Sequence, residues 1–124
     1  MYDIINIMVG GALGAIARYK LGTWIGSKWS SVFPIHTLII NVTGAFLLGF
    51  LNILFIERFK ISPTWRLGIG VGLLGAYTTF STFSYEIIML VENGSSVAAA
   101  LYAFSSLLLG LLFATIGVIL ARLI

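Results

Sequence analysis

Long runs of residues without a charged side chain constrain this chain more than any other feature of its sequence. Three runs contain no Asp, Glu, Lys or Arg: residues 37–56, 67–85 and 93–121. About 20 consecutive apolar residues cross a bilayer as a helix, because a helix satisfies its own backbone hydrogen bonds in lipid. Only 14 uncharged residues separate Asp3 from Arg18, so a further span must continue past Arg18. We therefore predict an all-α membrane protein of one domain, residues 1–124, with four transmembrane helices at about 4–26, 35–56, 65–91 and 95–123.

The composition supports a membrane protein and argues against several other classes. Hydrophobic residues make up 60% of the chain and charged residues 9%, with a mean hydropathy of +1.10, which lies outside the range of soluble domains. Without cysteine and with a single histidine, His36, the chain offers neither a disulfide framework nor a histidine and cysteine metal site. The net charge of +3 is small and scattered, which argues against nucleic-acid binding. The four carboxylates are too dispersed to form a catalytic set, so the sequence does not indicate an enzyme.

The basic residues predict little preference for one orientation in the membrane. Four spans place both termini on one side, and cytoplasmic loops normally carry the excess of Lys and Arg. The terminal side holds four basic residues, Arg58, Lys60, Arg66 and Arg122. The other side holds three, Arg18, Lys20 and Lys28. This balance favours insertion in both orientations with antiparallel pairing of two copies; insertion in one orientation under a weak bias is the alternative.

The third span has an unusual composition for a membrane helix. Residues 77–84 contain six hydroxyl-bearing side chains and two phenylalanines. Hydrocarbon penalises such a composition unless the hydroxyls line something polar. In a helix, Phe80 and Phe83 stand at positions i and i+3, on one face and about 4.5 Å apart along the axis. Because ring edges carry a weak positive potential, this pair would suit a narrow passage for a small anion; packing against neighbouring helices is the alternative.

Two glycine pairs predict close contacts between helix backbones. Gly10 with Gly14, and Gly68 with Gly72, each form the G-x-x-x-G pattern that lets helices approach in lipid. Packing within one chain and contact between two copies both fit this pattern.

Three segments of the chain resemble the motifs of a known family. Residues 75–86 read GAYTTFSTFSYE, residues 10–19 read GGALGAIARY, and residues 37–44 read TLIINVTG. These segments resemble the signature of the Fluc or CrcB family, the small fluoride channels of bacteria and archaea. The resemblance covers essentially the whole chain in length, number of spans and order of motifs.

The resemblance implies a passive, fluoride-selective channel in a prokaryotic cell membrane, built as an antiparallel, dual-topology homodimer with two pores at the subunit interface. The implied partners are fluoride, the lipid bilayer and a second copy of the chain, without nucleic acid or a protein substrate. The family pattern assigns to each pore Asn41, Phe80, Thr82, Phe83, Tyr102 and Ser106. For Tyr102 and Ser106, hydrogen bonding between helices is the alternative. It also implies a break in the third helix, where the carbonyls at Gly75 and Thr78 hold a central sodium ion that is structural and not transported.

Two alternatives and three departures from the family pattern accompany this interpretation. A small proton-coupled multidrug exporter also has four spans and needs a carboxylate in the membrane, for which Glu86 is the candidate. The second alternative is a structural membrane subunit without transport activity, which would not explain the clustered hydroxyl side chains. The departures are Ala76, His36 and Gly110, which stand where relatives commonly have glycine, glycine and serine. We expect His36 to be a solvated interface residue, with pH sensing as the alternative.

Overall fold

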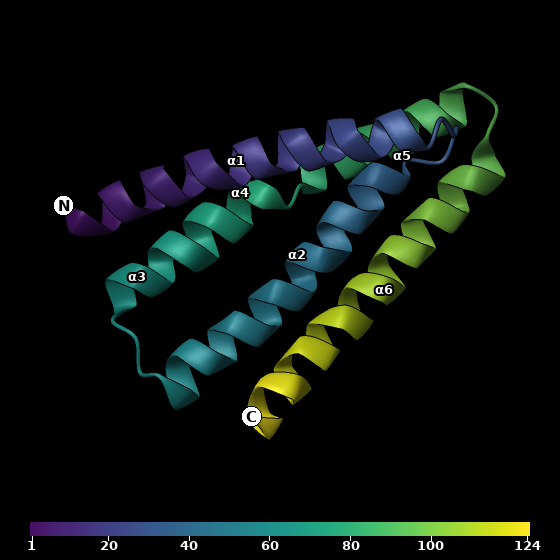
Figure 1. Cartoon of the computed structure of the whole chain (residues 1–124). Helices are drawn as coiled ribbons and strands as arrows, with labels where there is room; N and C mark the ends of the chain where they lie inside the picture. Colours follow the sequence, from purple (N-terminus) through teal and green to yellow (C-terminus); the bar gives the residue numbers. More distant parts are fainter.

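The computed structural model describes all 124 residues, and every regular element in it is helical (Figure 1). In chain order the elements are α1 (Tyr2–Lys28), α2 (Ile35–Ile53), the π-helical turn η1 (Leu54–Arg58), α3 (Pro63–Leu67), the π-helical segment η2 (Gly68–Leu74), α4 (Gly75–Tyr77), α5 (Phe80–Glu92) and α6 (Ser96–Leu123). The predicted all-α architecture is confirmed.

Three of the helices are long and apolar enough to cross a membrane: Tyr2–Lys28, Ile35–Arg58 and Ser96–Leu123. The remaining helical segment, from α3 to α5, is divided into shorter pieces, of which the longest, α5, has 13 residues. Only 18 of the 124 residues are buried, and large apolar side chains cover the outer surface of the helices. Such a surface is stable in lipid, where exposed apolar groups carry no hydration penalty. The chain is thus a bundle of four helical segments, the third of which is interrupted.

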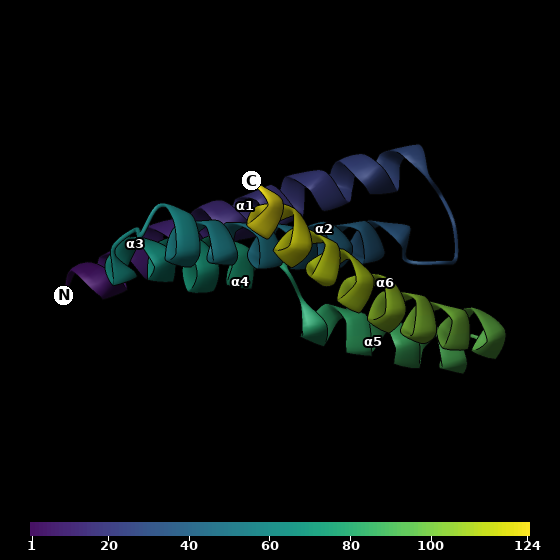
Figure 2. The same ribbon diagram turned by 90° about the horizontal axis from the view of Figure 1, so that it is seen from below.

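Thr78 and Thr79 form the interruption. Both have extended backbones, with φ −81° and ψ 159° at Thr78 and φ −150° and ψ 115° at Thr79. The Thr79 hydroxyl then caps α5 by accepting a hydrogen bond from the Thr82 backbone N–H at 3.2 Å, which satisfies one of the free donors in the first helical turn. The interruption lets η2 and α4 pack against α1 while α5 packs against α6, as Figure 2 shows.

Glycines bring helix backbones into direct contact at two interfaces. A methyl group at Gly10, Gly14 or Gly72 would collide with the backbone of the facing helix, in the interface between α1 and η2. The interface between α2 and α6 is built in the same way around Gly49 and Gly117. The two glycine pairs singled out in the sequence therefore serve packing within one chain.

The helices alternate in direction along the bundle. In Figure 1 both termini and the connection from η1 to α3 lie toward one end, while the α1–α2 and α5–α6 connections lie toward the other. Gly94 makes the short α5–α6 connection with a φ of +80°, a conformation that side chains disfavour. Helix α2 contacts α1, η2, α4 and α6, so its side chains reach the interruption from the centre of the bundle.

Candidate functional site

An amide from helix α2 holds the interruption of the third segment. Nδ2 of Asn41 donates to the Thr79 carbonyl at 3.0 Å, and the Thr79 backbone N–H donates to Oδ1 of Asn41 at 2.8 Å. One carboxamide therefore pairs with both backbone polar groups of a single residue, and its second N–H remains free. These two bonds replace helical hydrogen bonds that the extended backbone cannot make, which matters most where no water is available.

The same arrangement frees backbone carbonyls beside the interruption. In an unbroken α-helix the Thr79 N–H would donate to the Gly75 carbonyl, and the Thr82 N–H to the Thr78 carbonyl. Here the first donates to Asn41 and the second to the Thr79 hydroxyl. Carbonyl oxygens are hard ligands that suit an alkali cation, so Gly75 and Thr78 fit the sodium ion that the resemblance implies. No group of three or more His, Cys, Asp or Glu side chains lies elsewhere in the chain to hold a metal ion.

A cavity of about 390 Å³ opens beside the interruption. Four of the predicted pore residues line it, namely Asn41, Phe80, Phe83 and Ser106, together with both predicted sodium-site residues. The Phe80 and Phe83 ring centroids lie 5.7 Å apart, with the ring planes inclined at 47°. The Ser106 hydroxyl is buried and has no hydrogen-bond partner. Because an unpaired buried hydroxyl costs free energy, it is suited to a ligand inside this cavity.

A second cavity, of about 490 Å³, lies between α1 and the first turns of α2 and α5. Arg18 and Tyr19 of α1 and His36 of α2 line it, and Arg18 is the only Lys, Arg, Asp or Glu in its wall. Thr82, predicted as a pore residue, lines this second cavity and not the first. Thr79 lines both, so the interruption forms the boundary between the two cavities.

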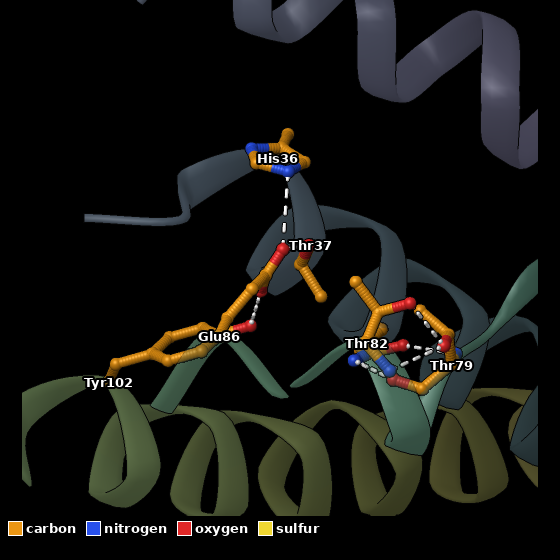
Figure 3. A network of polar contacts seen from close by, with 7 residues as sticks. His36, Thr37, Thr79, Thr82, Glu86 and Tyr102 are labelled. Atoms are coloured by element: carbon orange, nitrogen blue, oxygen red, sulfur yellow. Dashed lines mark hydrogen bonds and ion pairs between the residues drawn. The ribbon is translucent and has the colours of Figure 1, made fainter. Parts of the chain in front are cut away.

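Glu86 of α5 is the centre of a polar network that no sequence motif predicted (Figure 3). The Thr37 hydroxyl donates to Oε1 of Glu86 at 2.8 Å, and the Tyr102 hydroxyl donates to Oε2 at 2.7 Å. Nε2 of His36 lies 3.4 Å from Oε1. These partners come from α2 and α6, and Thr37 stands 49 positions from Glu86, so no local spacing in the sequence connects them.

Tyr102, predicted as a pore residue, belongs to this network and lines neither cavity. Its side chain is fully buried. The Tyr102 ring meets the Phe83 ring edge to face, with centroids 5.1 Å apart, and meets the Phe33 ring edge to face at 5.4 Å. Tyr102 therefore connects the Glu86 carboxylate to one of the two aromatic rings of the first cavity.

Comparison with known proteins identifies the family of the chain. A family model described as CrcB-like protein, Camphor Resistance (CrcB), matches residues 5–118. A protein of Acidobacterium capsulatum named fluoride-specific ion channel FluC is 46% identical over 113 residues, which are 91% of this chain and 90% of that protein. A protein of the same name from a Roseiflexus species is 47% identical over 120 residues, which are 97% of each chain. Another from Oceanobacillus iheyensis is 46% identical over 121 residues, covering 98% of this chain and 92% of that protein. The chain is a multi-pass membrane protein that belongs to the CrcB family.

Proposed function

We propose that this chain is a fluoride-selective ion channel, not an enzyme, and that it lets fluoride leave the cell passively. The observation that carries the proposal is the first cavity, which is lined by Asn41, Phe80, Phe83 and Ser106. The Asn41 amide has one N–H without a partner, and the Ser106 hydroxyl has no partner. Weak donors and ring edges can replace the water around a small anion one contact at a time. The relatives named fluoride-specific ion channels support fluoride as that anion.

The charge of the first cavity suits conduction rather than tight binding. No Lys or Arg lines it, and a fixed positive charge there would hold an anion too strongly for it to leave. Neutral hydrogen fluoride crosses lipid and ionises in a near-neutral cytoplasm, where the anion is then trapped. The inside-negative membrane potential drives anions outward, so an open pathway is sufficient and no energy source is needed.

The same proposal includes a second copy of the chain, packed antiparallel to form two pores. The Phe80 ring lines the cavity, yet 78% of the residue is exposed in a single chain. A second copy on this face would cover the ring and complete the cavity wall, and the nearly equal numbers of basic residues on the two sides favour the opposite orientation for that copy. The freed carbonyls of Gly75 and Thr78 would hold the central structural sodium ion, which supplies positive charge between the two copies.

The proton-coupled exporter fits the geometry less well. That mechanism needs a carboxylate that exchanges protons and cationic substrates inside a transport cavity. Two hydroxyls hold the Glu86 carboxylate, His36 lies over it, and the Glu86 side chain is only 17% exposed. Glu86 also lines neither of the two cavities. We therefore assign the Glu86 carboxylate a structural role between the helices and not the exchange of protons and cationic substrates.

Fluoride efflux from liposomes that contain the purified protein tests the proposed function. Potassium-loaded liposomes with a potassium ionophore would release fluoride but not chloride through the wild-type channel. A Phe80→Ile/Phe83→Ile double variant removes both rings of the cavity and should abolish fluoride release. Phe104→Ile is the matched control, because Phe104 of α6 is 76% exposed and lines neither cavity. Absence of fluoride release from folded wild-type protein, or equal release from the double variant, would contradict the proposal.

A further inference from the structure

The second cavity contains the only histidine of the chain, placed directly over a carboxylate. His36 lies in the cavity wall, and its Nε2 is 3.4 Å from Oε1 of Glu86. The histidine side chain is 41% exposed and the glutamate side chain 17%. Glu86 does not itself line the cavity, and Figure 3 shows the His36 ring directly over its carboxylate.

The network fixes the position of the carboxylate independently of His36. The hydroxyls of Thr37 and Tyr102 each donate to one oxygen of Glu86, at 2.8 and 2.7 Å. With both oxygens held, a proton on His36 does not release or redirect Glu86. Protonation therefore adds one positive charge at a fixed place in the cavity wall.

The other charges around this cavity make the added charge effective. Arg18, from α1, is the only other cationic residue in the wall, and Tyr19 is the only other titratable residue there. With His36 neutral, the negative charge of Glu86 behind the wall opposes the positive charge of Arg18. With His36 protonated, the histidine and the carboxylate neutralise each other, and Arg18 is left to attract anions into the cavity.

We infer that protonation of His36 adds a positive charge that draws fluoride toward the interruption, so that the channel conducts better at acidic than at alkaline pH. The inference rests on the proposed function, because it concerns access of fluoride to that pathway. Imidazole is the side chain that ordinarily changes charge near neutral pH. Acid surroundings are also where more hydrogen fluoride forms and enters the cell, so this response would raise export when the fluoride load rises.

The expected size follows from the charge alone. A unit charge about 7 Å from the anion, screened as in water, changes the local anion concentration about threefold. His36 is the only histidine of the chain, so a change of this size in fluoride current near neutral pH can be assigned to it.

Fluoride current across planar bilayers, with the same pH on both sides, tests the inference. Hydrogen fluoride carries no charge and does not contribute to the current, and equal pH makes the orientation of the protein irrelevant. Wild-type current should be about threefold larger at about pH 6 than at about pH 8 in low salt. His36→Gln keeps a hydrogen-bonding side chain without the titration, and its current should stay at the wild-type level of about pH 8 throughout. His36→Lys keeps the charge at both values, and its current should stay near the wild-type level of about pH 6.

Three results separate failure of the inference from failure of the proposed function. If His36→Gln retains the wild-type pH response, or His36→Lys behaves as His36→Gln does, the inference is wrong and the channel proposal stands. If wild-type protein carries a fluoride current that does not change with pH, the inference is also wrong. If wild-type protein carries no fluoride current at either pH, the proposed function itself is wrong and the inference falls with it.

Discussion

Replacing Asn41 with Asp changes one of the two hydrogen bonds that hold the interruption of the third segment. The new side chain keeps an oxygen that can accept from the Thr79 N–H, where the present distance is 2.8 Å. It loses the Nδ2 donor, so a carboxylate oxygen would face the Thr79 carbonyl across the present 3.0 Å. Leaving that carbonyl without its donor costs about 1–3 kcal/mol. We therefore expect the variant to fold with a lower melting temperature.

In the proposed pathway the negative charge also opposes an anion that enters the first cavity, which Asn41 lines. Two like charges about 5 Å apart at an effective dielectric constant of about 20 repel each other by roughly 3 kcal/mol. A barrier raised by this amount slows permeation by about two orders of magnitude. The predicted loss of fluoride flux is thus much larger than the loss that incomplete folding alone would cause.

Fluoride efflux and thermal unfolding of Asn41→Asp, measured on the same preparation, check both parts of this reasoning. Asn52→Asp is the matched control, because Asn52 lies on the same helix, is exposed and lines neither cavity. The control should keep the wild-type flux and melting temperature. A flux in Asn41→Asp within about threefold of the wild type, well short of the roughly hundredfold loss expected, would refute the placement of Asn41 beside the permeating anion.

Two further predictions concern packing at the interruption and the Glu86 network. A methyl group at Gly44 would collide with the Thr78 side chain, so Gly44→Ala should destabilise the fold by about 1–3 kcal/mol and reduce fluoride efflux. Gly110→Ala is the control, because no atom lies within 4 Å of the added methyl group, and it should change neither stability nor efflux. Equal melting temperatures for the two variants would contradict this prediction. Tyr102→Phe removes the hydroxyl that donates to Glu86 at 2.7 Å and should cost about 1–2 kcal/mol in thermal unfolding, and an unchanged unfolding curve would show that the hydrogen bond contributes nothing.

The fold could be predicted from local properties of the sequence because a bilayer leaves few choices. A long uncharged run in lipid has to be helical, and α2 and α6 follow from such runs directly. The interruption at Thr78 and Thr79 was predicted only through the family resemblance, since neither residue is a helix breaker such as proline. Asn41, 38 positions earlier in the chain, holds the extended conformation. Local propensity cannot reveal a break that a distant side chain stabilises.

The candidate site could be predicted only in part, for a related reason. Phe80 and Phe83 share a helix face, so their spacing alone placed them together, and they do line one cavity. The residues around Glu86 come from two other helices, and their approach depends on how α2, α5 and α6 cross. His36 was expected to be a solvated interface residue. It is partly exposed, but it also lies against Glu86, a contact that only the tertiary structure reveals.

The glycines between the helices have a consequence for how this protein can change through mutation. In a soluble domain the large buried side chains are the least replaceable residues, because any change leaves a hole or a clash. Here most large apolar side chains lie on the outside of the helices, where one apolar side chain facing lipid can replace another. The positions without a side chain are the ones where even a single methyl group meets a neighbouring backbone. Saturation mutagenesis of this chain should therefore give the opposite pattern to that of a soluble domain: substitutions should be tolerated at leucine and isoleucine and should be harmful at the smallest residues.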